Sequence, residues 1–160
     1  MGMILNYHRV SSDDLTAFLD DSSLLYDYIS KVYDSEPSPA HLDIDKAWDG
    51  ISFILRQIDP TEELAQIILS GALIDEEQDF GCGPAHYLTP NEVATFNTVL
   101  SKITKTDLIA HFNPDEMDDI YPQIWADEDA FDYIYDNFQN MQAFYAQAAA
   151  NKEAIIATLG

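Results

Sequence analysis

Apolar positions recur with the spacing of amphipathic helices along most of the chain. In residues 11–21 and 22–33 they return every three or four positions, which predicts two helices with one buried face each. Asp43 stands where an N-cap belongs and Asp45 near the positive end of the helix dipole, so a third helix is predicted directly after Asp43. Gly50 in this helix is expected to allow close packing against a neighbour. The apolar stripe of the helix consists of Ile44, Trp48, Ile51, Ile54, Leu55 and Ile58.

Signals of helix starts continue through the second half of the chain. Asp59, Pro60 and Glu62 have the order cap, first-turn proline and early acid, which predicts a helix over residues 59–71 that ends at Gly71. The motifs "TPNE" (89–92) and "NPDE" (113–116) repeat this order, and "TKTD" (104–107) is a weaker version. They predict helices at 90–102, 114–119 and 105–111, and the periodicity of 127–152 predicts the longest helix.

Three segments favour strands instead. They are residues 2–10, residues 86–88, and residues 153–159, which contain the β-branched pair Ile155 and Ile156. Residues 72–86 are irregular, and Pro122 makes 121–125 extended or turn-like. The predicted fold class is therefore α+β, rich in helices, with a small sheet that joins both chain ends. The chain has no linker or repeat, so a single domain over 1–160 is expected.

Several of these segments together resemble a known family. They are "MGMI" at the start, "LDIDKAWDGISFIL" after the helical pair, "YLTPNEV" before a helix and "HFNPDEMDDIYPQIW" before the last long helix. Their wording and order are similar to the YfbM-like family, a bacterial domain of unknown function, over nearly the whole chain. The resemblance implies a small α+β protein, and it supplies no active-site residues to transfer.

Charge restricts the classes of partner. The chain has 29 acidic against 7 basic residues, a net charge of −22 at pH 7. This field repels DNA, RNA and anionic membranes, whereas it attracts a basic protein. It also keeps a protein soluble without any further function. With one cysteine, no secretory signal and no long apolar run, the chain is predicted to be cytoplasmic and not a membrane protein.

Asp43, Asp45 and Asp49 form the first candidate site. Their carboxylates suit Ca²⁺ or Mg²⁺, but the spacing is not that of an EF-hand loop. The alternative is that they cap a helix and cover its exposed face. We favour that alternative and predict no metal site.

Cys82 and His86 form the second candidate, a nucleophile and a base in a glycine-containing loop. The sequence has no G-x-S-x-G, H-E-x-x-H or Walker motif, and "GCGPAH" matches the dinucleotide fingerprint only in part. We therefore predict no catalytic residue and no cofactor.

Tyr121 and Trp125 form the third candidate, because they lie between the acidic runs 115–119 and 127–132. Aromatic side chains flanked by acids suit a groove for a basic, apolar partner. The alternative is that Trp125 packs into the core.

Two functional hypotheses follow. The first is a non-enzymatic interaction protein whose acidic surface binds a basic partner, as immunity proteins do with a toxin. The second is a small hydrolase or ligand-binding enzyme with a site near residues 80–86 and the acids at 43–49.

Overall fold

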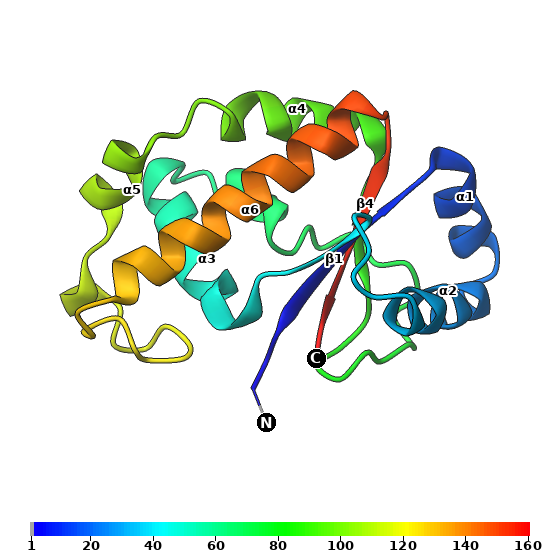
Figure 1. Ribbon diagram of the computed structural model, residues 1–160, viewed down its shortest axis with the longest axis horizontal. Helices are drawn as coiled ribbons and strands as arrows, with labels where there is room; N and C mark the ends of the chain where they lie inside the picture. The colour runs from blue at the N-terminus through cyan, green and yellow to red at the C-terminus, as the bar shows by residue number, and fades with distance from the viewer. Residues whose placement is uncertain (1) are drawn as a thin grey trace.

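The structure is a computed structural model that describes residues 2–160. Helices cover both faces of a small sheet (Figure 1). The strands are β1 (Leu5–Val10), β2 (His41–Asp43), β3 (His86–Leu88) and β4 (Ala154–Leu159). The α-helices are α1 (Ser12–Asp20), α2 (Ser23–Asp34), α3 (Trp48–Ile58), α4 (Pro90–Leu100), α5 (Lys105–His111) and α6 (Ala130–Ala150). Short 3-10 helices are η1 (Asp45–Ala47), η2 (Leu64–Ile67) and η3 (Pro114–Glu116).

The sheet joins the two ends of the chain. Its strand order is β2-β1-β4-β3, and every neighbouring pair is antiparallel. β1 and β4 pair over their whole length, from Leu5 opposite Leu159 to Val10 opposite Ala154. The predicted α+β class, with a small sheet formed by both chain ends, is confirmed.

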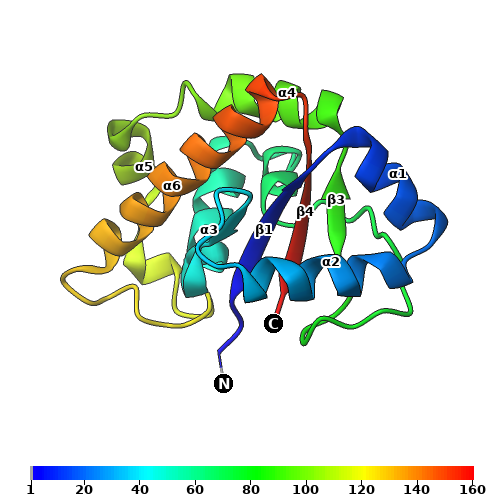
Figure 2. The same ribbon diagram turned by 45° about the vertical axis from the view of Figure 1, so that its right-hand side comes forward.

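The alternation of side chains along β1 divides the core between the two faces. Leu5 and Tyr7 point into the larger cluster, to which α3, α4, α5 and α6 contribute. Val10 of β1 points into a smaller cluster that is covered by α1 and α2, and so does Ile156 of β4. Figure 2 shows α2 lying across β1 and β4 on this second face.

Two buried tyrosines tie the larger cluster together. The hydroxyls of Tyr7 and Tyr145 both donate to the carbonyl of Ile67, at 2.8 and 2.7 Å. Burial raises the pKa of both tyrosines, so their hydroxyls remain protonated donors. The irregular segment around Ile67 is thereby fixed against the sheet and α6.

Side-chain caps are present at the starts of three helices. Ser11 caps α1 through the backbone N–H of Asp14, and Thr89 with Glu92 forms a complete capping box at α4. Thr104 does the same at α5 with Asp107. Each cap satisfies backbone N–H groups that a helix start leaves unpaired.

Three predicted helices are wrong in extent. Residues 41–47 form β2 and a 3-10 turn, so the third helix begins at Trp48 and its N-cap is Ala47, not Asp43. The backbone of Asp45 is left-handed (φ 50°), which a helix does not tolerate. Residues 59–71 contain only η2, and residues 114–119 contain only η3.

The absence of the predicted α-helix at residues 59–71 has a local cause. Asp59 accepts hydrogen bonds from the backbone N–H groups of Thr61 and Leu64 and from the Thr61 hydroxyl. This turn competes with helical backbone bonds. Glu62 adopts a φ of 66°, so the chain leaves the helical region within the first turn.

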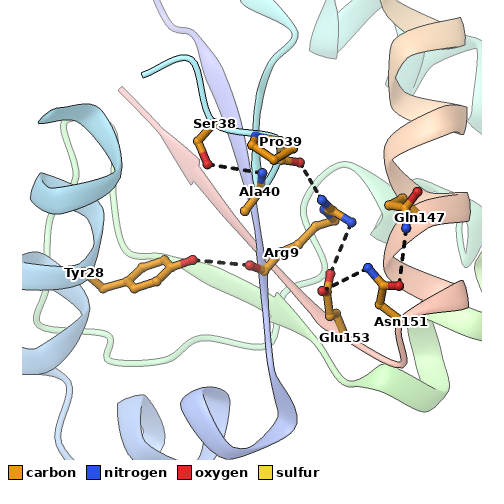
Figure 3. A network of polar contacts seen from close by, with 8 residues as sticks. All are labelled: Arg9, Tyr28, Ser38, Pro39, Ala40, Gln147, Asn151 and Glu153. Atoms are coloured by element: carbon orange, nitrogen blue, oxygen red, sulfur yellow. Dashed lines mark hydrogen bonds and ion pairs between the residues drawn. The ribbon is translucent and has the colours of Figure 1, made fainter. Parts of the chain in front are cut away.

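Arg9 connects β1 with two neighbouring segments (Figure 3). Its guanidinium donates to the carbonyl of Pro39 at 2.7 Å, lies 3.5 Å from Glu153 and stands over the ring of Phe144. Tyr28 of α2 donates to the Arg9 carbonyl at 3.3 Å. The Arg9 guanidinium is therefore engaged in contacts within the fold.

Between residues 2 and 160, no helix is both long enough and apolar enough to span a bilayer.

Candidate functional site

A groove of about 480 Å³ opens on the α2 side of the sheet. Residues of three strands, of α2 and of the loop after residue 75 line it, namely Ile4, Asn6, Ile29, Tyr33, His41, Asp43, Phe80, Thr158 and Gly160. Asn6 pairs with Thr158 of β4 on one side and with Asp43 of β2 on the other. Because paired residues point to the same face, this register brings three polar side chains side by side.

His41 is held at the groove wall by polar contacts on both ring nitrogens. Its Nε2 lies 2.8 Å from Oδ1 of Asn6, and its Nδ1 contacts a carboxylate oxygen of Glu36. Neither nitrogen is free to accept a proton from a substrate. His41 therefore serves to position its neighbours.

The groove has a negative electrostatic character. Burial raises the pKa of Tyr33, and the nearby carboxylates of Asp43 and Glu36 raise it further. Both carboxylates are exposed.

His8 lies behind this wall and is fully buried. Its ring stacks on His41 with 5.0 Å between centroids, and neither of its nitrogens has a hydrogen-bond partner within residues 2–160. Burial, and then the charge of His41, lowers its pKa to about 3. The imidazole is therefore neutral at physiological pH.

The three aspartates of the first candidate site diverge. Asp43 accepts from the backbone N–H of Asp45 at 2.6 Å and borders the groove. Asp45 accepts from the Tyr133 hydroxyl at 2.8 Å, and Asp49 accepts from the backbone N–H of Tyr121 at 3.0 Å. They fix different parts of the chain, and no cluster of three potential metal ligands occurs in the described part of the chain.

Cys82 lies at the tip of an ordered loop. Asp79 accepts from the backbone N–H groups of Gly81 and Gly83, and these bonds lower the pKa of its carboxyl. The two glycines have φ values of 121° and 111°, which other residues rarely adopt. The Cys82 side chain is exposed, and its backbone N–H donates to the carbonyl of Leu159.

His86 has a separate environment. Its Nδ1 accepts from the backbone N–H of Gly71 at 3.0 Å, and half-burial lowers its pKa. It borders a cavity of only about 10 Å³, room for one water molecule. No hydrogen bond joins His86 to Cys82 among residues 2–160, so the two do not form an aligned pair.

Tyr121 and Trp125 hold the fold together. The Tyr121 hydroxyl accepts from the backbone N–H of Met3 at 2.8 Å. Trp125 is only 2% exposed and donates to the carbonyl of Ile120 at 2.8 Å. Trp125 therefore packs into the core, and its ring is not available to a partner.

The groove residues Asn6, Tyr33, His41 and Thr158 were not identified as a site in the sequence. One signal was available, because Thr158 is the polar position in the otherwise apolar strand β4. The meeting of Asn6 and Thr158 depends on the register between β1 and β4, which the sequence does not specify.

Comparison with known proteins gives the family. A family model described as a domain of unknown function, DUF1877, matches residues 1–158. The chain is therefore a member of the DUF1877 family. A search of curated protein sequences gave no significant match.

A solved structure gives the same fold. The chain is similar to the crystal structure of YfbM from Escherichia coli, a protein of unknown function, with a TM-score of 0.75 and 17% identity. The match covers 98% of this chain and 99% of that one. The YfbM-like resemblance of the sequence is thereby confirmed.

Proposed function

We propose that the protein is a non-enzymatic, cytoplasmic interaction protein that binds a basic protein partner through its acidic surface. Neutralising a basic toxin or enzyme, as immunity proteins do, is the concrete form of this function. The surface charge carries the proposal. None of the acidic side chains is buried, and most are exposed.

These carboxylates are largely free of internal counterions. Within residues 2–160, one ion pair joins Arg9 to Glu153, and the ring of His41 contacts the carboxylate of Glu36. No lysine or arginine occurs between residues 106 and 151, although acids are frequent there. Such a field accelerates encounter with a basic protein and fixes its orientation.

A capture experiment tests this function. The full chain is immobilised, exposed to lysate at low salt and eluted with high salt, and each candidate is then purified. Direct titration calorimetry with the purified candidate must give a stoichiometric complex that weakens as salt increases. If no purified candidate binds in this way, the proposal is rejected.

Matched variants locate the surface. Asp13, Asp20 and Asp27 are exposed on α1 and α2, whereas Asp115, Asp118 and Asp119 are exposed in the segment before α6. Replacing either set by asparagine removes the same charge and leaves the described hydrogen bonds intact. One triple variant is expected to weaken the complex more than the other, because a docked partner covers one face.

Ligand binding is the second candidate function, and the groove is the observation that favours it. Its volume of about 480 Å³ is within the range of small-molecule sites. Groove residues Asp43 and Phe80 belong to the two segments that the sequence suggested for such a site. A thermal-shift screen with small cationic and neutral metabolites tests it, and stabilisation only by neutral compounds would favour it over the first function.

A further inference from the structure

The groove offers hydrogen-bond acceptors that the fold leaves free. Oδ1 of Asp43 accepts from the N–H of Asp45, whereas Oδ2 has no hydrogen bond to another residue in the described range 2–160. Thr158 is only 4% exposed, yet its side chain borders the groove. These two acceptors face the groove from β2 and from β4, on either side of Asn6.

The walls between these acceptors are apolar and aromatic. Tyr33 is 46% exposed, and Phe80 stacks on Tyr26 with 4.7 Å between centroids. Ile4 and Ile29 add apolar side chains to the lining. A long side chain with apolar methylene groups and a charged end matches this combination of surfaces.

The carboxylates near the groove favour a cation at the charged end of such a side chain. Asp43 and Glu36 both act on Tyr33 at the groove, and no lysine or arginine is among the residues that line it. A guanidinium has five N–H donors in one plane, which suits acceptors on different strands better than a compact ammonium does. It also stacks on aromatic rings such as that of Tyr33.

We propose that the groove receives an arginine side chain of the basic partner, with its guanidinium against Asp43 and Thr158 and its methylenes along Tyr33 and Phe80. This inference rests on the proposed function and names the group of the partner that is recognised. Arginine in a preformed pocket is a common energetic centre of protein interfaces.

A titration followed by NMR tests the groove without the partner. N-acetyl-arginine amide is added to the ¹⁵N-labelled full chain, and N-acetyl-citrulline amide, which has the same shape without the charge, is the matched control. The arginine probe is expected to shift the backbone signals of Asn6, Asp43 and Thr158 in a saturable manner. Citrulline is expected to bind at least about tenfold more weakly, because it lacks the charge-assisted hydrogen bonds.

Two variants make the test specific. Asp43→Asn keeps an acceptor for the N–H of Asp45 and removes the charge, so it is expected to weaken binding of the arginine probe about tenfold or more. Asp115→Asn is the control on a distant, exposed acid and is expected to leave that binding unchanged. Equal binding of citrulline, equal effects of both variants or shifts scattered over the acidic surface would overturn the inference.

The purified partner separates this inference from the function on which it rests. If Asp43→Asn leaves the complex unchanged while a triple surface variant weakens it, the groove inference fails and the proposed function stands. If the arginine probe binds as expected but no basic protein does, the proposed function fails. A more than tenfold loss of partner affinity in Asp43→Asn would support both.

Discussion

His8 is an ionisable residue that the fold buries completely. A fully buried imidazole without a hydrogen-bond partner is costly, because the fold removes it from water and returns no bond. It is packed among the rings of Tyr28, Tyr33 and His41. The fold therefore uses it as an aromatic ring that must stay neutral.

This environment makes stability depend on pH. In the unfolded chain the imidazole binds a proton near its ordinary pKa of 6.5, whereas in the folded chain its pKa is about 3. The contribution of neutral His8 is complete above pH 6.5 and is lost as the pH falls from 6.5 toward 3. The loss relative to neutral pH reaches roughly 2 to 3 kcal/mol at about pH 4.5.

The substitution His8→Phe retains the ring and removes the titration. Denaturant unfolding at about pH 7 and pH 4.5 is expected to show a smaller acid-induced loss of stability in this variant than in the parent chain. His111→Phe is the control, because that histidine is only partly buried. Identical pH dependence in the parent chain and His8→Phe would contradict this account of His8.

At the scale of elements, the packing of α3 against the 120–125 segment depends on Gly50. A Cβ at this position would lie 2.6 Å from Cη2 of Trp125. Gly50→Ala is therefore expected to lower the free energy of unfolding by about 1 to 2 kcal/mol, since overpacking outweighs the better helix propensity of alanine. Denaturant unfolding measures this change.

A double-mutant cycle tests whether contact with Trp125 causes the loss of stability in Gly50→Ala. In the background of Trp125→Phe, which removes the ring atoms nearest Gly50, the Gly50→Ala substitution is expected to be neutral or stabilising. A loss of the same size in both backgrounds would mean that Trp125 is not the cause.

The capping box of α4 provides a second test at this scale. Thr89→Ala removes the acceptor for the N–H of Glu92 and is expected to cost about 1 kcal/mol. Thr98→Ala, an exposed change inside the same helix, serves as the control. Comparable losses in the two variants, measured by thermal unfolding, would argue against a stabilising cap.

The same elements show what the sequence predicts and where it fails. Local sequence patterns predicted the strands at both ends and most helices, because each depends on residues close in sequence. Asp59 and Asn113 carry cap-like patterns equal to that of Thr89, yet neither begins an α-helix. At Asp59 the competing turn decides the outcome, and no local pattern distinguishes it from a cap.

Most residues of the candidate groove could not be predicted from local sequence patterns. Asp43 was selected from the sequence for its acid spacing, and Phe80 belongs to the suggested loop. Asn6, His41 and Thr158 join them through pairing between strands that are far apart in sequence, and β2 itself was missed. A three-residue edge strand has too little periodicity to be predicted.

At the scale of the whole molecule, β4 holds the two halves of the core together. Ile155 belongs to the cluster under α6, and Ile156 belongs to the cluster under α1 and α2. We propose on this basis that residues 1–160 fold as one domain. Loss of β4 would expose both clusters at once.

The net charge of −22 also acts on the whole molecule. Mutual repulsion between exposed carboxylates favours expanded states, and salt screens it over a Debye length of about 10 Å at 0.1 M. The melting temperature is therefore expected to rise by several degrees with added sodium chloride at neutral pH. A constant or falling melting temperature would contradict a structure limited by self-repulsion.

The central claim is that the exposed carboxylates recruit a basic protein. The most direct test is the dissociation constant of the purified partner complex as a function of sodium chloride concentration, for the parent chain and for both triple aspartate-to-asparagine variants. We predict that the affinity of the parent chain falls steeply with salt and that the variant on the docking face has a weaker affinity and a smaller salt dependence. An affinity that is independent of salt and equal in all three proteins would contradict the claim.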